Sequence, residues 1–548
     1  MGQRRYSFPG SLTRVIGIVT FFELLILLCC VLGAGIRKTS GRQEQAVMIS
    51  GSLIGTEAEQ PAEVEETQEM PGEEAQSAQE QSNTVPTNSA QSDPMPSETE
   101  QELSAAGETS PEMAAAGTVS EPGIRVRLTV SDYSSEYHEF VTISCDGTFQ
   151  LQTGEKAQIY TGGQTVTISR DHPFFQDGSI RVSSETGGVR IDSIAHRNLV
   201  NTYPGILDLY LEDAGIRIVN ELGLEAYVER VVPSEMPASY GREAAMLQAV
   251  CTRTYAYQKL TNGVMDAYGA AVNDSTDYQV YNAAPVHETS SLASSDTRGI
   301  VMTWQGKPFV PYFFSTSCGY NSDNAIWGGE ILPFLRTQNL TYQGEINYYS
   351  EEEFRAFIMN WDYPAYEDDC TWYRWNYTIG LEDLKQSLSE RLTEQLAAGT
   401  GIRAVDSAGA ECTADPLWLN GLQNIVVTKR LSGGMAGEVA ILCEQGTICL
   451  DKEMVIRNVF GSPARVYINR SSQGRSESEG NYLPSAFFYP CANYEGDQLI
   501  SFTFYGGGNG HGIGLSQNAA HAMLQMGLTW QEVLQFFYLG TGMTKMYP

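Results

Sequence analysis

The spacing of apolar and polar residues changes along the chain. Between residues 123 and 225, short stretches alternate apolar and polar side chains, are rich in β-branched residues, and are separated by Gly and Asp-Gly turns. A period of two with such turns is typical of half-buried antiparallel strands. We therefore expect a small β-rich region at 123–225, with strands at 124–130, 141–144, 165–168 and 216–219.

Helical spacing appears further along the chain. Residues 242–260 place Ala244, Leu247, Val250 and Thr254 on one face, as a helix requires. Further helices are expected at 381–396 and 516–527, and strands at 425–428 and 438–442. Residues 226–548 should therefore form one domain of mixed helices and strands, and the fold class should be α+β.

The N-terminal segment has a different pattern. Residues 15–36 are mainly apolar, which is long enough to span a hydrocarbon core of roughly 30 Å and longer than a cleaved signal peptide usually requires. We predict that residues 1–38 form a short cytoplasmic tip and a single transmembrane anchor, with the C-terminal part outside the cell. A cleaved signal peptide is the alternative.

The charge is concentrated in the next segment. Residues 43–122 contain 17 acidic residues and no Lys, Arg or aromatic residue. Such a composition buries too little apolar surface to offset its chain entropy, so we expect residues 39–122 to be a disordered acidic linker. The net charge of −32 argues against nucleic acid as a partner, because phosphate binding needs clustered Lys and Arg.

Neither histidines nor cysteines indicate a metal site. The six histidines form no H-x-x-x-H or H-E-x-x-H pattern, and the ten cysteines form no C-x-x-C pair. We therefore expect no metal ion and no cofactor.

Glu235 is the first candidate for chemistry. It lies between Pro233 and Pro237, which fix the backbone on either side and favour an extended Met236. Apolar neighbours would raise the pKa of a carboxyl group in a partly closed site, as an acid that protonates a glycosidic oxygen requires. The alternative is a carboxylate at a helix N-terminus, where the helix dipole favours its charge.

A glycine-rich turn near the C-terminus is the second candidate. Residues 506–514 contain six glycines, interrupted at His511 and elsewhere, and Ser516 then suits the N-cap of a helix. Glycines such as Gly512 let a ligand approach the backbone, and the free N–H groups near Gln517 would steady sugar oxygens or a carboxylate. His511 could contact substrate or belong only to the turn. A nucleotide loop and a serine hydrolase fit poorly, because G-x-G-x-x-G and G-x-S-x-G are both missing.

A hydroxyl-rich segment at 312–320 is the third candidate. Ser315 and Thr316 stand among aromatic residues, and Trp327 follows. Hydroxyls beside aromatic rings suit sugar binding by hydrogen bonds and stacking. Trp327 could instead be a core residue.

Together these segments resemble the SpoIID/LytB family, the sporulation proteins that cut peptidoglycan glycan strands. The resemblance covers residues 124–548 and rests on VPSEMP at 232–237, QAVCTRTYA at 248–256, YFFSTSCGY at 312–320, WGG at 327–329 and GHGIGLSQ at 510–517. It implies a lytic transglycosylase with Glu235 as its acid/base and Arg253 at the substrate site. It also implies substrate strands without stem peptides, a partner amidase, other sporulation membrane proteins and a role in engulfment.

The chain departs from the family pattern at several positions. Family members often carry a histidine where Phe314 stands, and some carry a further histidine near Tyr320. In some relatives these histidines, with a cysteine such as Cys318, look like metal ligands. A lysine of the pattern is Met246 here. Because Gln248 and Arg253 are separated by about 140° around a helix, we expect only one to face the groove, and we favour Arg253.

Two classes of function therefore remain. The first is a membrane-anchored lytic transglycosylase that cleaves peptidoglycan, with its substrate bound by Gln248, Arg253, Ser315, Thr316, His511, Gly512, Ser516 and Gln517. The second is a non-catalytic module that binds glycan or enhances an amidase. A purely structural surface anchor would leave both motifs without a role.

Overall fold

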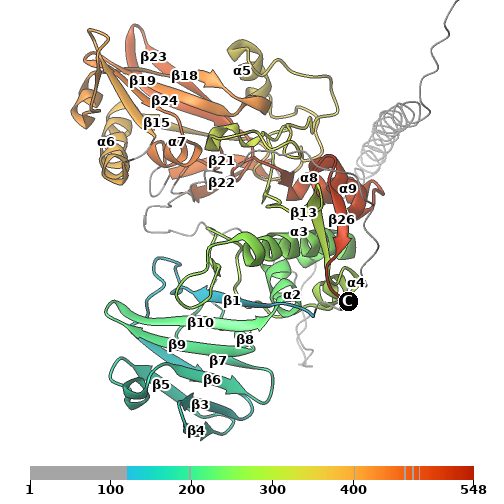
Figure 1. Cartoon of the computed structure of the whole chain (residues 1–548). Coiled ribbons are helices and arrows are strands. Elements are labelled where there is room, and N and C mark those ends of the chain that lie inside the picture. Colours follow the sequence, from blue (N-terminus) through green and yellow to red (C-terminus); the bar gives the residue numbers. More distant parts are fainter. Residues whose placement is uncertain (1–119, 197–198, 400, 462–464, 472–473, 481) are drawn as a thin grey trace, which may run out of the picture. The chain divides into compact units, whose positions relative to one another are not determined.

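The computed structural model describes residues 120–548, apart from 197–198, 400, 462–464, 472–473 and 481 (Figure 1). The expected membrane segment at 15–36 and nearly all of the acidic linker lie outside the described residues. No helix within the described ranges combines the length and the apolar character needed to cross a membrane. The α+β class is confirmed, since helices alternate with mainly antiparallel sheets.

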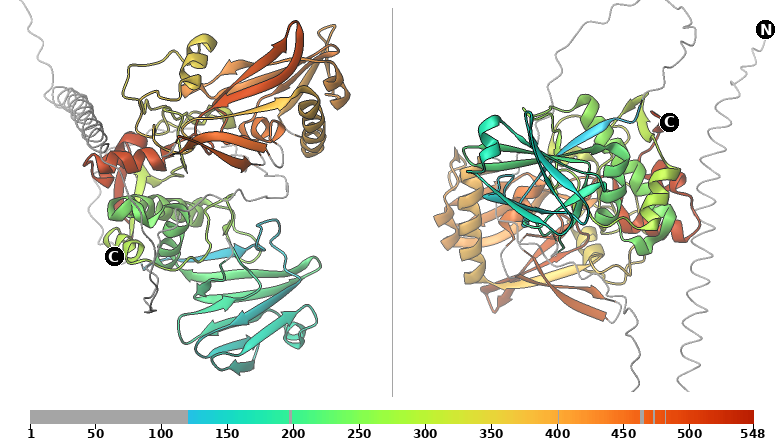
Figure 2. Two further views of the ribbon diagram at one scale, coloured as in Figure 1. Left: turned by 180° about the vertical axis from the view of Figure 1, so that it is seen from behind. Right: turned by 90° about the horizontal axis from the view of Figure 1, so that it is seen from below.

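The alternating N-terminal region folds as two sheets. One has seven strands in the order β11-β1-β10-β9-β6-β3-β4, and the other has four in the order β5-β2-β7-β8 (Figures 1 and 2). All four strands predicted there are present. Alternate side chains of β1 (Ile124, Val126 and Leu128) are buried, as the period of two predicts. The strands are β1 (Gly123–Leu128), β2 (Phe140–Ser144), β3 (Phe149–Thr153), β4 (Lys156–Tyr160), β5 (Thr165–Ser169), β6 (Ile180–Ser184), β7 (Gly188–Ile191), β8 (Thr202–Pro204), β9 (Ile206–Glu212), β10 (Gly215–Gly223) and β11 (Val272–Asn273).

Three helices follow, and the second connects two hydrophobic cores. They are α2 (Leu224–Glu235), α3 (Gly241–Asn262) and α4 (Glu288–Asp296). In α3, Ala249 and Ala256 pack in the core of the β-rich region, whereas Leu247 and Val250 pack in a second core with α8 (Gln517–Gln525) and α9 (Trp530–Phe537). The predicted boundary at 225/226 falls where β10 passes into α2, and residues on both sides share one core.

A third core lies under two five-stranded sheets, ordered β22-β21-β15-β24-β23 and β17-β16-β20-β19-β18. The helix expected at 381–396 is α6, and the strands expected at 425–428 and 438–442 lie in β18 and β19. The elements of this part are α5 (Glu351–Met359), β15 (Trp375–Gly380), α6 (Leu381–Ala398), β16 (Ile402–Asp406), β17 (Glu411–Cys412), β18 (Leu422–Arg430), β19 (Ala436–Cys443), β20 (Gly446–Leu450), α7 (Glu453–Val459), β21 (Arg465–Ser471), β22 (Gly474–Gly480), β23 (Phe488–Glu495) and β24 (Gln498–Gly506).

Short strands join segments that are distant in sequence. β12 (Ile300–Trp304) pairs with β13 (Lys307–Pro308) and with β26 (Gly542–Lys545). β14 (Phe313–Phe314) pairs in parallel with β25 (Leu515–Ser516), with Phe314 opposite Ser516. This second pair holds the hydroxyl-rich segment beside the start of α8, where the glycine-rich turn ends.

Candidate functional site

Glu235 is the last residue of α2, at the corner between α2 and α3. Met236 is extended (φ −133°, ψ 127°), as expected from Pro237, and the 3-10 turn η2 (Ala238–Tyr240) leads into α3. The half-buried Glu235 accepts a 2.7 Å hydrogen bond at Oε1 from the Val280 N–H. Because Glu235 ends a helix rather than beginning one, a favourable dipole at a helix N-terminus does not explain it.

Gln517 joins this corner to the start of α8. Its Nε2 donates to the backbone carbonyl oxygen of Glu235 at 3.0 Å and to Oε1 of Gln248 at 3.2 Å. Gln248 lies on α3 and is fully buried, whereas Gln517 retains a small exposed area. The structure therefore brings together three of the residues singled out from the sequence, from α2, α3 and α8.

The hydroxyl-rich segment is tied to the same helix start. Asn518 Nδ2 donates to Thr316 Oγ1 at 2.8 Å, and the Ser315 and Thr316 hydroxyls are 3.1 Å apart. Asn518 Oδ1 in turn accepts from the hydroxyl of Tyr240, five residues beyond Glu235. A chain of hydrogen bonds thus runs from the turn after Glu235 through α8 to Ser315.

Glu367 is a buried carboxyl group on the other side of the α8 start. It accepts from the Ser317 N–H at 2.9 Å and from the hydroxyls of Ser317 and Ser516. Burial raises the pKa of Glu367 to about 7, and the bonds from Ser317 and Ser516 oppose that rise. Ser516 occupies the N-cap position, as predicted, but its hydroxyl donates to Glu367 rather than capping the helix.

Arg253 is buried inside the protein, where it forms an ion pair. It is completely buried, and its Nε and Nη2 donate to the two oxygens of Glu225 at 2.8 and 2.7 Å. Further bonds reach Ser294 O and Ile300 O. The guanidinium has no exposed surface to offer a substrate, and it is Gln248, not Arg253, that lies beside Gln517. The preference for Arg253 over Gln248 is therefore reversed.

The glycines of the turn serve close packing. Gly512 has φ +77°, and a Cβ there would lie 2.3 Å from the Phe487 ring; at Gly514 (φ +80°) a Cβ would lie 2.1 Å from the Tyr312 carbonyl oxygen. Both are buried. The sequence pattern had suggested that glycines admit a ligand, whereas here they admit neighbouring protein.

His511 lies in an aromatic setting. Its ring centroid is 5.7 Å from Phe314, 6.2 Å from Tyr312 and 5.5 Å from Trp327. Nδ1 accepts from the Ile513 N–H at 3.1 Å, so the side chain also braces its own turn. Burial lowers the pKa of His511 to about 4, which leaves a neutral imidazole at pH 7.

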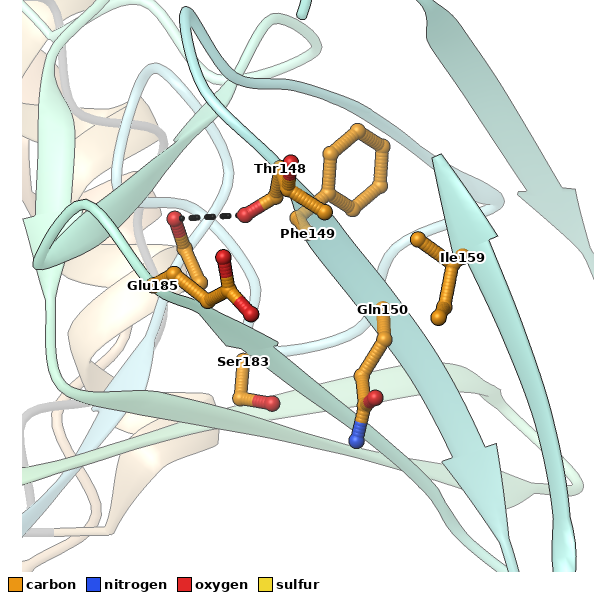
Figure 3. A pocket seen from close by; sticks show the side chains of 7 residues that line it. Thr148, Phe149, Gln150, Ile159, Ser183 and Glu185 are labelled. Carbon is orange, nitrogen blue, oxygen red and sulfur yellow. Dashed lines mark hydrogen bonds between the residues drawn. The ribbon is translucent and has the colours of Figure 1, made fainter. Parts of the chain in front are cut away.

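No group of three His, Cys, Asp or Glu side chains within the described ranges is placed to hold a metal ion. One hollow of about 280 Å³ lies on the β-rich region, lined by residues of β3, β4 and β6 and by Thr148 and Glu185 (Figure 3). Ser184 there donates to the Thr148 carbonyl at 3.1 Å. Its lining includes none of the site residues described above.

Comparison with known proteins agrees with this assembly. A family model described as stage II sporulation protein matches residues 212–304, which contain Glu235, Gln248 and Arg253. Residues 212–304 thus match the SpoIID family, and the resemblance of the chain to the SpoIID/LytB family is confirmed. A second model, described as a domain of unknown function (DUF8618), matches residues 321–514. Ser315, Thr316, Ser516 and Gln517 lie in neither matched range, although they meet the SpoIID segment in space.

Two relatives of the family come from Bacillus subtilis (strain 168). The chain is 24% identical over 342 residues to stage II sporulation protein D. The aligned region covers 60% of this chain and 76% of that protein. It is 25% identical over 319 residues to an amidase enhancer, and the aligned region covers 58% of this chain. The match spans only 40% of the amidase enhancer.

Sequence reasoning missed three residues of the site: Tyr240, Glu367 and Asn518. Asn518 directly follows Gln517 and could have been suspected from its position at the helix start. Glu367 stands in an acidic run, EDD at 367–369, where nothing distinguishes a buried carboxylate from solvated ones. Only the fold shows that it is fully buried.

Proposed function

We propose that this chain is a peptidoglycan lytic transglycosylase that cleaves between N-acetylmuramic acid and N-acetylglucosamine and leaves 1,6-anhydro products. The observation that supports it most is the position of Glu235. Glu235 is half-buried at the α2–α3 corner, and its carboxyl group accepts a hydrogen bond from the Val280 N–H. Its backbone carbonyl oxygen accepts from Gln517, which links the corner to the start of α8. One positioned carboxyl group suffices for this reaction.

The chemistry uses Glu235 twice. The protonated carboxyl first gives its proton to the glycosidic oxygen, and the bond between that oxygen and the anomeric carbon of the muramic acid breaks. The 6-hydroxyl of the same sugar then bonds to the anomeric carbon and returns its proton to Glu235. No water is consumed, and the enzyme ends in the protonation state in which it began.

Two-carboxylate hydrolysis fits the site less well. An inverting or retaining glycosidase needs a second carboxylate facing the sugar. Glu367 is the other carboxyl group joined to the α8 start, and it is fully buried and held by Ser317 and Ser516. It therefore cannot reach a glycan and serves instead to hold the hydroxyl-rich segment on α8.

The cellular setting is part of the proposal. The apolar segment at 15–36 would anchor the chain in the cell membrane and the acidic linker would let the C-terminal domain reach the wall. Substrate strands stripped of stem peptides imply a partner amidase. Engulfment during sporulation and vegetative wall remodelling are both compatible with this arrangement.

A second candidate is a non-catalytic module that binds glycan or enhances an amidase. It is favoured by the similarity to the amidase enhancer. It is also favoured by Phe314 and Met246, which stand where the pattern implied by the family resemblance has histidine and lysine. This candidate predicts strand binding without cleavage.

The experiment compares the parent protein with Glu235→Gln on peptide-free glycan strands, with products read by mass spectrometry. Anhydro products from the parent and none from the variant support the transglycosylase. Products with an ordinary reducing end would indicate a hydrolase, and binding without cleavage by either protein would favour the second candidate.

A further inference from the structure

Trp327 is a large aromatic side chain left at the surface in a fixed position. It ends the 3-10 turn η3 (Asn324–Trp327), which Asp323 caps by accepting from the Ala325 N–H at 2.9 Å. The ring packs on Tyr312 (centroids 4.7 Å apart) and His511, yet 42% of the residue remains exposed. A rigid, exposed aromatic ring offers a flat apolar surface at little entropic cost, as sugar stacking requires.

A cavity of about 370 Å³ opens beside this ring. Trp327 and Gly328 belong to its lining, together with residues of β16, β18 and β19 and the two residues that precede α7. Gly437 also lines it, and a Cβ at this position would come within 2.6 Å of Leu431. The volume suits one sugar residue, and one wall is aromatic.

Some charged side chains of the cavity form ion pairs with each other, and others do not. Arg403 pairs with Glu438 and, at 3.5 Å, with Asp451, and Glu438 also accepts from Thr428 at 2.6 Å. Lys429 and Lys452 are exposed, and their side chains make no hydrogen bond or ion pair within the described part of the chain. Arg403 is shared by the two carboxylates, and with Lys429 and Lys452 the cavity lining has three cationic and two anionic side chains. The lining therefore carries a net charge of +1 in a strongly acidic protein, with two ammonium groups available.

We propose that this cavity is a glycan subsite for a sugar residue that carries a carboxylate. Trp327 stacks on the sugar ring, and Lys429 and Lys452 bind the carboxylate. Because the lactyl group of N-acetylmuramic acid exposes its carboxylate once the stem peptide is removed, the subsite would select peptide-free strands. The choice of ligand rests on the proposed function, whereas the cavity and its charges do not.

The subsite adjoins the motif that reaches Glu235. The Trp327 ring contacts His511, and the turn containing His511 continues into Ser516 and Gln517. A sugar bound in the subsite would therefore rest on Trp327, which contacts the turn that leads to the Glu235 corner.

The test measures binding by calorimetry, using the full chain with Glu235→Gln so that strands stay intact. The probes are a peptide-free glycan tetrasaccharide and the same compound with its carboxylates converted to methylamides. Trp327→Ala is compared with Tyr349→Ala, another exposed aromatic, and Lys429→Ala/Lys452→Ala with Lys307→Ala/Lys545→Ala. All six residues are at the surface, so folding should be preserved.

The proposal expects Trp327→Ala to weaken binding of both probes about tenfold, since stacking does not depend on the carboxylate. The Lys429/Lys452 variant should bind the acid severalfold more weakly but bind the methylamide like its parent, because the two changes remove the same interaction. Unchanged binding in both variants, or an equal loss for both probes in the lysine variant, would overturn it. Either result leaves the proposed cleavage by Glu235 untouched, since cleavage is measured separately.

Discussion

The side-chain amide of Gln517 donates a 3.0 Å hydrogen bond to the backbone carbonyl oxygen of Glu235, across 282 positions of sequence. This contact joins the two motifs that stand out in the chain. The glycine-rich turn thus supports the backbone of Glu235 through the first residue of α8, and its glycines allow the turn to pack against Phe487 and Tyr312. The turn is a support for the Glu235 corner.

Gln517→Ala should lower the cleavage rate by about 10–100-fold, because a small displacement of a catalytic group is costly in rate. The free energy of unfolding should fall by only about 1 kcal/mol, the usual net effect of such hydrogen bonds. Cleavage assays and urea unfolding measure the two effects. Gln525→Ala, at the other end of α8, is the control and should keep full activity; equal rates for the two variants would contradict the supporting role.

Arg253→Met should act on stability. It leaves Glu225 buried without its cationic partner, which should cost about 3–5 kcal/mol of unfolding free energy. Adding Glu225→Gln should recover part of that loss, because the uncompensated charge is gone. Urea denaturation tests both. A stable Arg253→Met protein with a raised KM would show that Arg253 contacts substrate after all.

Glu367 should make stability depend on pH. Its pKa is about 7 in the folded protein, against an ordinary value of 4.5, so between these values the native state holds a proton that the unfolded state has released. The contribution of Glu367 to the free energy of unfolding is fully present below pH 4.5 and is lost as the pH rises through 7. The loss is about 3 kcal/mol at most. Unfolding free energies at pH 4.5 and pH 8 measure this.

Glu367→Gln is the matched variant, since it keeps the shape and cannot ionise. Its stability relative to the parent should increase from pH 4.5 to pH 8. A stability difference that is the same at both pH values would mean that Glu367 does not titrate in this range.

Periodicity predicted the elements whose role is packing. The helix at 242–260 and the strands at 425–428 and 438–442 are all present, because alternation and helical spacing directly reflect burial. The helix α2 was missed. Pro233 normally ends a helix, yet α2 continues two residues further, with Tyr227, Val228 and Val231 fully buried on its inner side.

The sequence did not predict which of two polar residues on the same helix faces the site. Glu235, Gln248 and Gln517 were expected at the site and do meet there, but the preference for Arg253 over Gln248 was reversed. Spacing shows that both cannot face one groove; it does not show which one finds Glu225, 28 positions earlier in the chain. The buried position of Glu367 could not be predicted for the same reason, because its partners lie far from it in the sequence.

The most direct measurement of the central claim is product analysis of peptide-free strands digested by the parent protein and by Glu235→Gln. The account predicts products lighter by one water than hydrolytic ones from the parent, and a rate at least about 1,000-fold lower in the variant. Anhydro products formed at the parent rate by Glu235→Gln would contradict it.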